Sequence, residues 1–367
     1  MKLQTHRTYN FNAGPSALPI SVLEKAQAEL IDFRGTGMSV MELSHRSSAY
    51  ETVHNQAINS LKELLSIPDN YEVLFLQGGA SLQFSMIPMN FLRSGKKAGY
   101  VMTGSWSEKA FSEAKLFGDI YHAASTKESS YRSIPKVDEI EFNPDHAYLH
   151  LTSNNTIYGT QWNDFPDTGD VPLIADMSSD ILSKPIDVSK FALIYAGAQK
   201  NLGPSGVTVV IIRKDLLEQA NTNIPTMLKY STHAKNNSLY NTPPTFGIYM
   251  LGEVLNWVRE IGGLTAIAEQ NEKKAKLIYD VIDTSNGFYI GHAKPDSRSL
   301  MNITFNLNSK ELEKNFLEQT KQEGFVGVNG HRSIGGCRVS AYNAIPFDAC
   351  KAFSEFMIHF QKDNGYN

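Results

Sequence analysis

The sequence predicts an α/β protein with a mixed, mostly parallel sheet flanked by helices, and a smaller α+β domain that includes the C-terminal part of the chain. Up to residue 262, short apolar runs alternate with helical patterns, which is typical of parallel strands joined by helical crossovers. After Gly262-Gly263 the pattern changes to long helices around a single strand. A chain of 367 residues is also long for one core. We therefore expect a large domain over 16–262 and a small domain formed by 1–15 and 263–367.

Short apolar runs mark the expected strands, and the spacing of the last two in the large domain makes the sheet mixed. Residues 201–206 are too few for a helical crossover, so the run at 207–212 should lie antiparallel to the run before it. The expected strands are 72–76, 98–102, 146–151, 172–175, 191–196, 207–212 and, in the small domain, 300–305.

Capping-box spacings, a serine followed three residues later by a glutamate, indicate two early helix starts. Ser21 with Glu24 and Ser48 with Glu51 have this spacing, so a helix is expected at each pair. The segment 78–81, Gly-Gly-Ala-Ser, predicts a turn that leads from the first strand into a helix. Further helices are expected at 82–92, 264–283, 311–322 and 347–360.

Composition excludes several classes of protein. The formal net charge of −4 provides no basic field for nucleic acid, and no apolar run reaches the roughly 18 residues of a membrane span. Cys337 and Cys350 are the only cysteines and have neither disulfide-framework nor zinc spacing, so no metal site is expected. The first ten residues lack the apolar core of a signal peptide. We expect a cytoplasmic enzyme for small molecules, without nucleic-acid or membrane partners.

Two residues that follow expected strands could share one crevice, because open α/β sheets bind ligands at the carboxyl ends of their strands. Asp176 comes directly after the run at 172–175, and Lys200 follows the run at 191–196. Taken alone, Asp176 is more often a cap or turn residue, and Lys200 is more often a solvated cation. Together they match pyridoxal phosphate chemistry, in which an amine forms a Schiff base and a carboxylate keeps the pyridine nitrogen charged.

Other strand ends carry residues suited to the same cofactor. The turn at 77–81 would point backbone N–H groups and the Ser81 hydroxyl at a phosphate, or serve only as a tight turn. Trp106 could stack on a flat ring, or pack at a helix start. Thr156 could bond a phenolic oxygen, or belong to a polar turn. Their common position after expected strands favours the binding interpretation.

Histidine–arginine pairs are candidates for binding an anionic substrate. One pair is His45-Arg46, just before a capped helix, and another is His331-Arg332, in a glycine-rich segment that also holds Arg338. Guanidinium groups bind phosphate and carboxylate in bidentate geometry, so these arginines suit a doubly anionic substrate. A surface salt bridge is the alternative for each arginine.

Seven segments together give the chain a close resemblance to the phosphoserine aminotransferase family, class V of the fold type I pyridoxal-phosphate enzymes. The resemblance covers nearly the whole chain and rests on residues 11–16, 39–46, 103–106, 175–179, 197–204, 241–246 and 330–338. It implies that fold and pyridoxal 5'-phosphate as cofactor. The implied reaction transfers the amino group of L-glutamate to 3-phosphohydroxypyruvate, a phosphorylated 2-oxo acid, giving O-phospho-L-serine and 2-oxoglutarate. A further implied substrate is the related 4-phosphohydroxy-L-threonine of pyridoxine biosynthesis.

The resemblance also implies a role for each site residue. Lys200 would be the Schiff-base lysine and Asp176 the partner of the pyridine nitrogen, with Trp106 stacked on the ring and Thr156 at its hydroxyl group. The implied phosphate-binding residues are Ala80, Ser81, Gln199 and, from the second subunit of a homodimer, Asn241 and Thr242. The implied substrate-binding residues are His45 and Arg46, again from the second subunit, together with His331, Arg332 and Arg338.

One departure from the family and four rival classes bear on this interpretation. Many members have a Gly-Arg pair where this chain has Ala80-Ser81, so backbone groups and the helix end would bind the cofactor phosphate.

An alanine-glyoxylate type aminotransferase, the first of the rival classes, shares the fold but needs no phosphate clamp. A cysteine desulfurase needs a reactive cysteine on a mobile loop, whereas Cys337 is expected to be packed. A nicotinamide dehydrogenase requires a G-x-G-x-x-G motif after the first strand, and a non-catalytic binding module would form no Schiff base.

Overall fold

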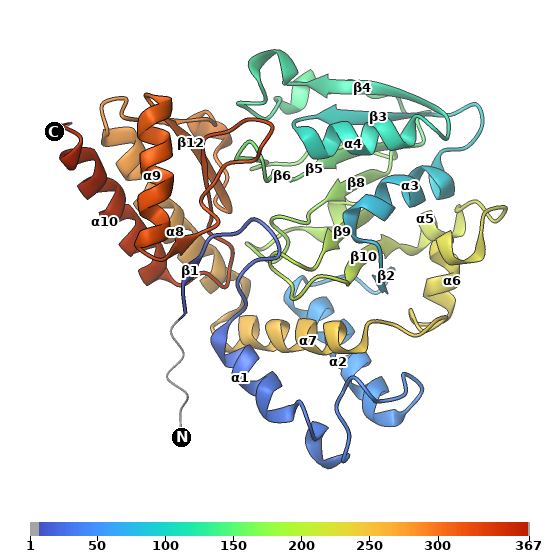
Figure 1. Ribbon diagram of the computed structural model, residues 1–367. Coiled ribbons are helices and arrows are strands. Elements are labelled where there is room, and N and C mark those ends of the chain that lie inside the picture. The colour runs from blue at the N-terminus through green and yellow to red at the C-terminus, as the bar shows by residue number, and fades with distance from the viewer. Residues whose placement is uncertain (1–6, 366–367) are drawn as a thin grey trace.

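The computed structural model of the protein describes residues 7–365, and a seven-stranded sheet lies at its centre (Figure 1). The strand order is β2-β10-β9-β8-β5-β3-β4. Strand β10 runs antiparallel to both of its neighbours, and the other neighbouring pairs of this sheet are parallel. The expected mixed, mostly parallel sheet is confirmed, including its antiparallel strand.

The strands of this sheet coincide with the apolar runs of the sequence, except at one edge. They are β2 (Tyr71–Leu76), β3 (Lys97–Met102), β4 (Asp119–Ser125), β5 (Tyr148–Thr152), β8 (Leu173–Asp176), β9 (Leu193–Gly197) and β10 (Thr208–Arg213). The edge strand β4 was not expected from the sequence. Its residues are largely exposed or half-buried, so no continuous apolar run marks it.

Helices cover both faces of the sheet. Successive side chains of β2 point alternately to the two faces and show which helices cover each one. Val73 and Phe75 belong to the core beneath α2 (Ser48–Leu64) and α7 (Thr245–Glu260). Leu74 and Leu76 belong to the opposite core, beneath α3 (Gly79–Phe91), α4 (Ser105–Ala114) and α6 (Tyr230–Lys235). Each fully buried side chain of this size contributes roughly 1.5–3 kcal/mol. The parallel centre is therefore buried on both faces.

A third apolar core lies beside the sheet and includes residues near both ends of the described chain (Figure 1). Its antiparallel sheet has the order β11-β12-β14 and is covered by three helices. The N-terminal strand β1 (Tyr9–Asn10) pairs in parallel with β13 (Phe325–Val326), and Phe11 is fully buried in this core. The other helices and strands around this core are α8 (Gly263–Thr284), β11 (Tyr289–Gly291), β12 (Asn302–Leu307), α9 (Lys310–Gln322), β14 (Cys337–Ser340) and α10 (Phe347–Asp363).

Three expected helix starts are wrong by one to three residues. Helix α1 (Ile20–Glu29) begins before Ser21, because the carbonyl of Pro19 accepts the first helical hydrogen bond, from the Leu23 N–H. The cap of α2 is Ser47 instead of Ser48, because the Ser47 hydroxyl accepts a hydrogen bond from the Tyr50 N–H. Helix α3 begins at Gly79 instead of residue 82, so most of the expected turn forms its first helical turn.

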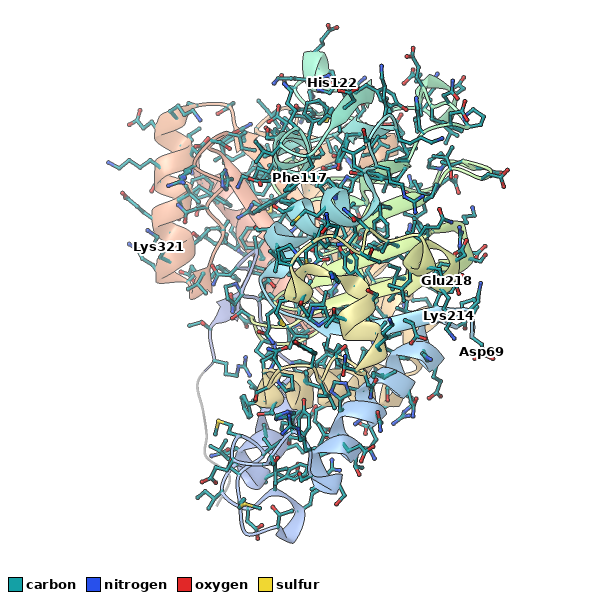
Figure 2. All side chains as sticks on the ribbon, turned by 90° about the vertical axis from the view of Figure 1, so that its right-hand side faces the viewer. Asp69, Phe117, His122, Lys214, Glu218 and Lys321 are labelled. Carbon is teal, nitrogen blue, oxygen red and sulfur yellow. The ribbon has the colours of Figure 1, made fainter. Side chains whose placement is uncertain are left out.

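Charged side chains project from the outer helices and tie some elements together (Figure 2). Lys214, the first residue of α5 (Lys214–Glu218), donates a hydrogen bond to the Asp69 carbonyl at 2.8 Å. Its Nζ also lies 3.5 Å from a carboxylate oxygen of Glu72, so it joins α5 to the start of β2. Within residues 7–365, the model has no helix that is long and apolar enough to cross a membrane.

Candidate active site

A cavity opens at the carboxyl ends of β8 and β9, beside the first turn of α3. It is lined by Gly79, Ala80, Ser81, Trp106, Thr152, Asn154, Asp176, Ser178, Ser179, Gln199 and Lys200. The lining includes every cofactor residue expected from this subunit except Thr156, which contacts the Lys200 amine. Residues widely separated in sequence thus meet at one end of the sheet.

Lys200 lies in the turn that follows β9, and two hydroxyl groups hold its amine. Nζ donates hydrogen bonds to Thr156 Oγ1 at 2.9 Å and to Ser179 Oγ at 2.6 Å. The Lys200 carbonyl accepts a hydrogen bond from the Ser16 hydroxyl at 2.6 Å, and the Gln199 carbonyl accepts one from the Ser16 N–H. The N-terminal segment therefore fixes the backbone of this turn, while the side chain remains in the cavity.

The electrostatic surroundings make Lys200 a better nucleophile than a solvated lysine. Burial lowers the pKa of its amine from the ordinary 10.5 to about 8. The charge of Asp176 opposes this shift, and the charge of Arg338 adds to it. Because only the neutral amine attacks a carbonyl group, a lowered pKa increases the reactive fraction at neutral pH.

Asp176 is the last residue of β8 and is nearly fully buried. Its Oδ1 accepts a hydrogen bond from the Ser178 N–H at 2.9 Å. Burial raises the pKa of the carboxyl group, while hydrogen bonds from Ser178 and the charge of Lys200 lower it. A buried carboxylate of this kind favours a cationic partner in the cavity.

The turn between β2 and α3 directs the start of a helix at the cavity. Gly78 and Gly79 have φ angles of 85° and 63°, and a Cβ at Gly78 would lie 2.7 Å from the Leu82 side chain. The first N–H groups of α3 have no partner within the helix, and Ala80 and Ser81 line the cavity. This wall is suited to an anion such as a phosphate group.

Trp106 contributes a flat aromatic wall with an unused donor. It lies in the first turn of α4, and its Nε1 is buried without a hydrogen-bond partner among the described residues. The Nζ atom of Lys109 lies 4.3 Å from the ring centroid, in cation–π contact. A planar ligand in the cavity can stack on the indole.

Arg338 and the segment around His331 bring positive charge to the same region. Nη1 of Arg338 donates to the Thr156 carbonyl at 3.4 Å, while its buried Nε has no partner among residues 7–365. Burial lowers the pKa of His331, and the charges of Arg338, Arg332 and Lys109 lower it further. The expected anion-binding groups of this subunit are therefore close enough to interact electrostatically.

The four residues expected from a second subunit do not line the cavity of this chain, and neither do His331, Arg332 and Arg338. His45 and Arg46 precede α2, and Asn241 and Thr242 precede α7. Arg46 and Thr242 are exposed. The sequence had assigned all four to a second subunit, and that assignment stays a prediction.

Sequence reasoning missed several polar groups that surround the amine and the carboxylate. Ser179 contacts Lys200 directly, Ser178 holds Asp176, and Asn154 and Thr152 line the cavity. Neither serine was assigned a role from the sequence. Their position directly after a strand end, beside the candidate carboxylate, was a signal that could have identified them.

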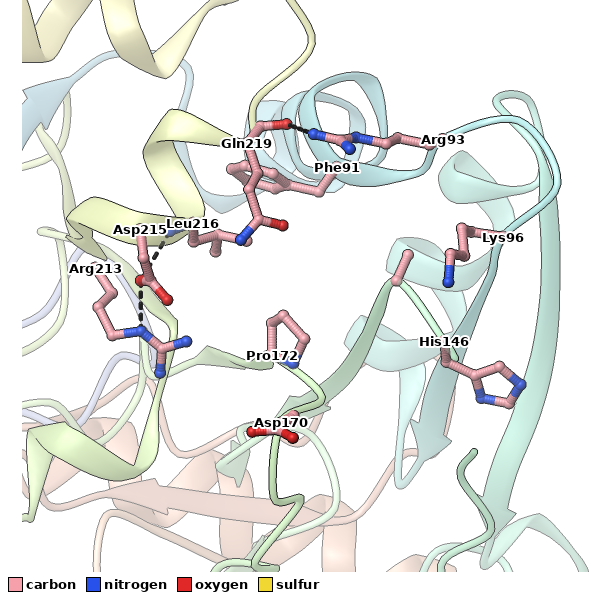
Figure 3. A pocket seen from close by; sticks show the side chains of 11 residues that line it. Phe91, Arg93, Lys96, His146, Asp170, Pro172, Arg213, Asp215, Leu216 and Gln219 are labelled. Carbon is pink, nitrogen blue, oxygen red and sulfur yellow. Dashed lines mark hydrogen bonds and ion pairs between the residues drawn. The ribbon is translucent and has the colours of Figure 1, made fainter. Parts of the chain in front are cut away.

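A separate hollow lies at the amino ends of the parallel strands, opposite the cavity, and carries exposed charges (Figure 3). The Arg213 Nε donates to Asp215 Oδ1 at 2.6 Å, and the guanidinium of Arg93 is bonded to the Gln219 carbonyl. These side chains are engaged with one another on the surface. The hollow contains no buried nucleophile, so the cavity at Lys200 is the better candidate for chemistry.

Neither cysteine nor metal chemistry is suggested by the remaining side chains. Cys337 and Cys350 are fully buried, and burial raises the pKa of each thiol. The expectation that Cys337 is packed is confirmed. No group of three or more His, Cys, Asp or Glu side chains in residues 7–365 could hold a metal ion.

The arrangement fits pyridoxal phosphate, which carries an aldehyde, a basic ring nitrogen, a flat ring and a phosphate. Lys200 can meet the aldehyde and Asp176 the nitrogen, while the unpaired Trp106 indole and the start of α3 suit the ring and the phosphate. The fold is that of the fold type I pyridoxal-phosphate transferases.

Comparison with known proteins identifies the family. The family model for aminotransferase class-V matches residues 8–352, so the chain belongs to the class-V aminotransferases. A curated relative, phosphoserine aminotransferase of Lysinibacillus sphaericus, is 70% identical over 98% of this chain and 99% of its own. The solved structure of phosphoserine aminotransferase from Bacillus circulans subsp. alkalophilus is 61% identical, with a TM-score of 0.97, over 98% of this chain and 100% of that one. The pyridoxal-phosphate-bound phosphoserine aminotransferase of Trichomonas vaginalis is 40% identical, with a TM-score of 0.91, over 96% and 100%.

Proposed function

We propose that this protein is a pyridoxal-phosphate-dependent aminotransferase that transfers the amino group of L-glutamate to 3-phosphohydroxypyruvate. The products are O-phospho-L-serine and 2-oxoglutarate, and the reaction is reversible. The supporting relatives match nearly their full length and share this activity by name. The observation that carries the proposal is the buried Lys200 amine of lowered pKa, in one cavity with the Asp176 carboxylate.

Lys200 and Asp176 divide the chemistry between them. Bound pyridoxal phosphate supplies an electron sink for the negative charge that forms when the substrate α-carbon loses a proton. The Nζ atom of Lys200 attaches the cofactor and, once released, moves the proton at that α-carbon. Asp176 stabilises the protonated ring nitrogen, which keeps the sink effective.

The walls of the cavity hold the cofactor in place. The first turn of α3, with Ala80 and Ser81, binds the phosphate together with Gln199, and Asn241 and Thr242 of a second subunit complete this site. Trp106 stacks on the ring. Thr156, whose hydroxyl already contacts the Lys200 amine, bonds the ring hydroxyl group.

The substrate is bound through its two anionic ends. Arg338 binds the α-carboxylate, and His331 and Arg332 bind the substrate phosphate with His45 and Arg46 of the second subunit. A homodimer is supported by the apolar surface near the His45-Arg46 pair. Ile31, Met38 and Met41 are 87%, 42% and 53% exposed there, which suits coverage by a second copy.

The proposal also covers the domain boundaries, the location of the protein and its biosynthetic role. The large domain spans 16–262, and the small domain combines 1–15 with 263–367, consistent with the separate apolar core and with the β1–β13 pairing. Residues 1–6 of that small domain lie outside the described part of the chain. The protein acts in the cytoplasm, in serine biosynthesis, and also accepts 4-phosphohydroxy-L-threonine for pyridoxine biosynthesis.

Reconstitution with the cofactor tests the chemistry. Purified protein incubated with pyridoxal phosphate should gain an absorption band near the visible edge, and borohydride should fix the cofactor on the peptide that contains Lys200. The Lys200→Ala variant should lose both the fixed label and the activity. Retention of the band and the activity by this variant would show that Lys200 is not the attachment site.

Half-reactions test the substrate. Wild-type protein should react with O-phospho-L-serine in strong preference to L-serine, because each arginine–phosphate contact is charge-assisted. Arg332→Ala should reduce that preference by about tenfold or more. A preference that is unchanged in Arg332→Ala would contradict the proposed phosphate clamp while leaving the cofactor assignment intact.

A further inference from the structure

A buried polar cluster lies behind Asp176, on the side of the sheet covered by α3 and α4. Tyr195 of β9 pairs in register with Asp176, so their side chains lie on the same face. His150 of β5 pairs with Ile174, two residues before Asp176, and so lies on that face as well. Tyr195 and His150 are 0% and 1% exposed. None of the proposed steps of the reaction uses either residue.

A hydrogen bond joins these two residues, and Tyr195 lies beside Asp176 on the neighbouring strand. The Tyr195 hydroxyl and His150 Nε2 are 2.9 Å apart. Tyr195 is the register partner of Asp176 and acts to lower the pKa of its carboxyl group, as the last and smallest of the causes that act on it. On its other side, the His150 ring stacks on Tyr100 with a centroid separation of 4.9 Å. The cluster is held in one geometry by buried neighbours.

The direction of the protons in this cluster follows from the groups available. Burial lowers the pKa of His150 to about 3, so the imidazole is neutral and carries one N–H. Its buried Nδ1 has no hydrogen-bond partner among the described residues. A buried N–H donor without a partner is costly, which places the proton on Nε2. Nε2 then donates to the Tyr195 oxygen, and the Tyr195 hydroxyl is free to donate to Asp176.

We propose that His150 and Tyr195 are positioning residues that form a buried hydrogen-bond relay, which holds the Asp176 carboxylate ionised and oriented toward the ring nitrogen of the cofactor. The inference rests on the proposed function, because it assumes that Asp176 meets that nitrogen. A donor that stabilises the carboxylate makes it a weaker base, so the proton stays on the ring nitrogen. The relay adds to the hydrogen bonds from Ser178 and the charge of Lys200, which oppose the effect of burial on this carboxyl group.

The protonation state of His150 gives a direct test that needs no activity. Nitrogen-15 NMR of histidine-labelled protein, with the signal assigned by its loss in His150→Leu, should show a neutral ring protonated on Nε2. A ring protonated on Nδ1 would overturn the relay, because Tyr195 would then have to donate to His150 instead of Asp176. This measurement decides the relay even if the protein turns out not to bind pyridoxal phosphate.

Cofactor affinity provides the second test, with a matched control in the same core. Tyr195→Phe should weaken the binding of pyridoxal phosphate to the apoprotein by about tenfold, for one hydrogen bond to a charged group. Tyr148→Phe removes another buried hydroxyl, one bonded to Tyr100 and not to Asp176, and should leave the affinity unchanged. Equal losses in the two variants would overturn the proposal, since the effect would then be general to the core.

Substitutions of His150 separate the relay from packing. His150→Leu keeps an apolar core but removes the donor, and should weaken pyridoxal phosphate binding by a few-fold. His150→Gln keeps an N–H donor at the end of the side chain and should restore part of the affinity. Equal affinities of the Leu and Gln variants would overturn the relay. A wild-type protein that binds no pyridoxal phosphate would contradict the proposed function instead.

Discussion

Two lysines of this chain, the buried Lys274 and the half-buried Lys200, have the same lowered pKa and different surroundings. Burial lowers the pKa of both Lys200 and Lys274 to about 8. The Lys200 amine lies in the cavity and contacts two side-chain hydroxyls. Lys274, on α8, is 1% exposed, and its amine donates to the carbonyls of Ala341, Tyr342 and Ile345 at 3.1, 2.7 and 3.2 Å.

The comparison shows that a perturbed pKa does not by itself mark a reactive group. An ammonium group has three protons, and three carbonyls engage all of them at Lys274. That lysine ties helix α8 to the chain after β14, which is a structural role. At Lys200 the partners are neutral hydroxyls beside open space, so a ligand can displace them. Access to a cavity separates Lys200, the proposed catalytic lysine, from the structural Lys274.

The largest expected difference between the two lysines is in activity. Lys200→Ala should lower kcat by about 10³-fold or more, because it removes the proposed attachment point and the proposed proton carrier. Lys274→Met should leave kcat of the folded protein within a few-fold, because its amine does not line the cavity. Steady-state assays with O-phospho-L-serine and 2-oxoglutarate measure both values. A comparable loss of kcat in a folded Lys274→Met protein would end this distinction.

Lys274 should instead matter for stability, and an exposed lysine on the same helix serves as the control. Lys274→Met removes a hydrogen bond from each of three buried carbonyls, of which the Tyr342 carbonyl keeps another from the Ile345 N–H, and should lower the free energy of unfolding by about 3 kcal/mol. Lys276→Met, on the same helix but exposed and paired only with Asp280, should change it by less than about 0.5 kcal/mol. Urea unfolding of the apoprotein measures both changes. Equal effects would show that the carbonyl contacts of Lys274 contribute little.

The pH dependence of chemical labelling should sharpen the contrast. The pKa of Lys200 is lowered, so its neutral, reactive fraction rises as the pH increases through about 8, whereas exposed lysines become reactive near 10.5. An amine-directed reagent and mass spectrometry should therefore label Lys200 in the apoprotein with a midpoint near pH 8. Lys274 should stay unlabelled while the protein is folded, since its amine is inaccessible. Labelling of both at the same rate would contradict the difference in access.

The smallest expected effect concerns the hydroxyl partners of Lys200. Ser179→Ala removes an acceptor that stabilises the charged amine, so the pKa of Lys200 should fall and the labelling midpoint should move to lower pH. Ser183→Ala changes a buried serine of the same segment that does not bond the amine, and should leave the midpoint unchanged. A shift to higher pH in Ser179→Ala would contradict this role.

Much of the fold was predictable, because the parallel sheet requires buried strands that appear as continuous apolar runs. Strands β8 and β9 were located closely enough to place Asp176 and Lys200 at neighbouring strand ends, where the structure has them. Edge strand β4 was missed, because its half-exposed residues carry no such run. The helix starts at Ser21 and Ser48 were misplaced, since neighbouring residues also satisfy the local hydrogen bonds.

The sequence by itself determined the α/β class, the mixed sheet and the pairing of Lys200 with Asp176, since all three follow from local pattern and from strand ends. Only the tertiary structure decided which polar residues surround them. Ser179 and Thr156 reach the amine from separate segments, and His150 lies behind the carboxylate on another strand. Lys274 stands in Glu-Lys-Lys-Ala-Lys, which has the composition of a solvated helix face. Its burial depends on a chain segment about 70 residues away, which no local pattern encodes.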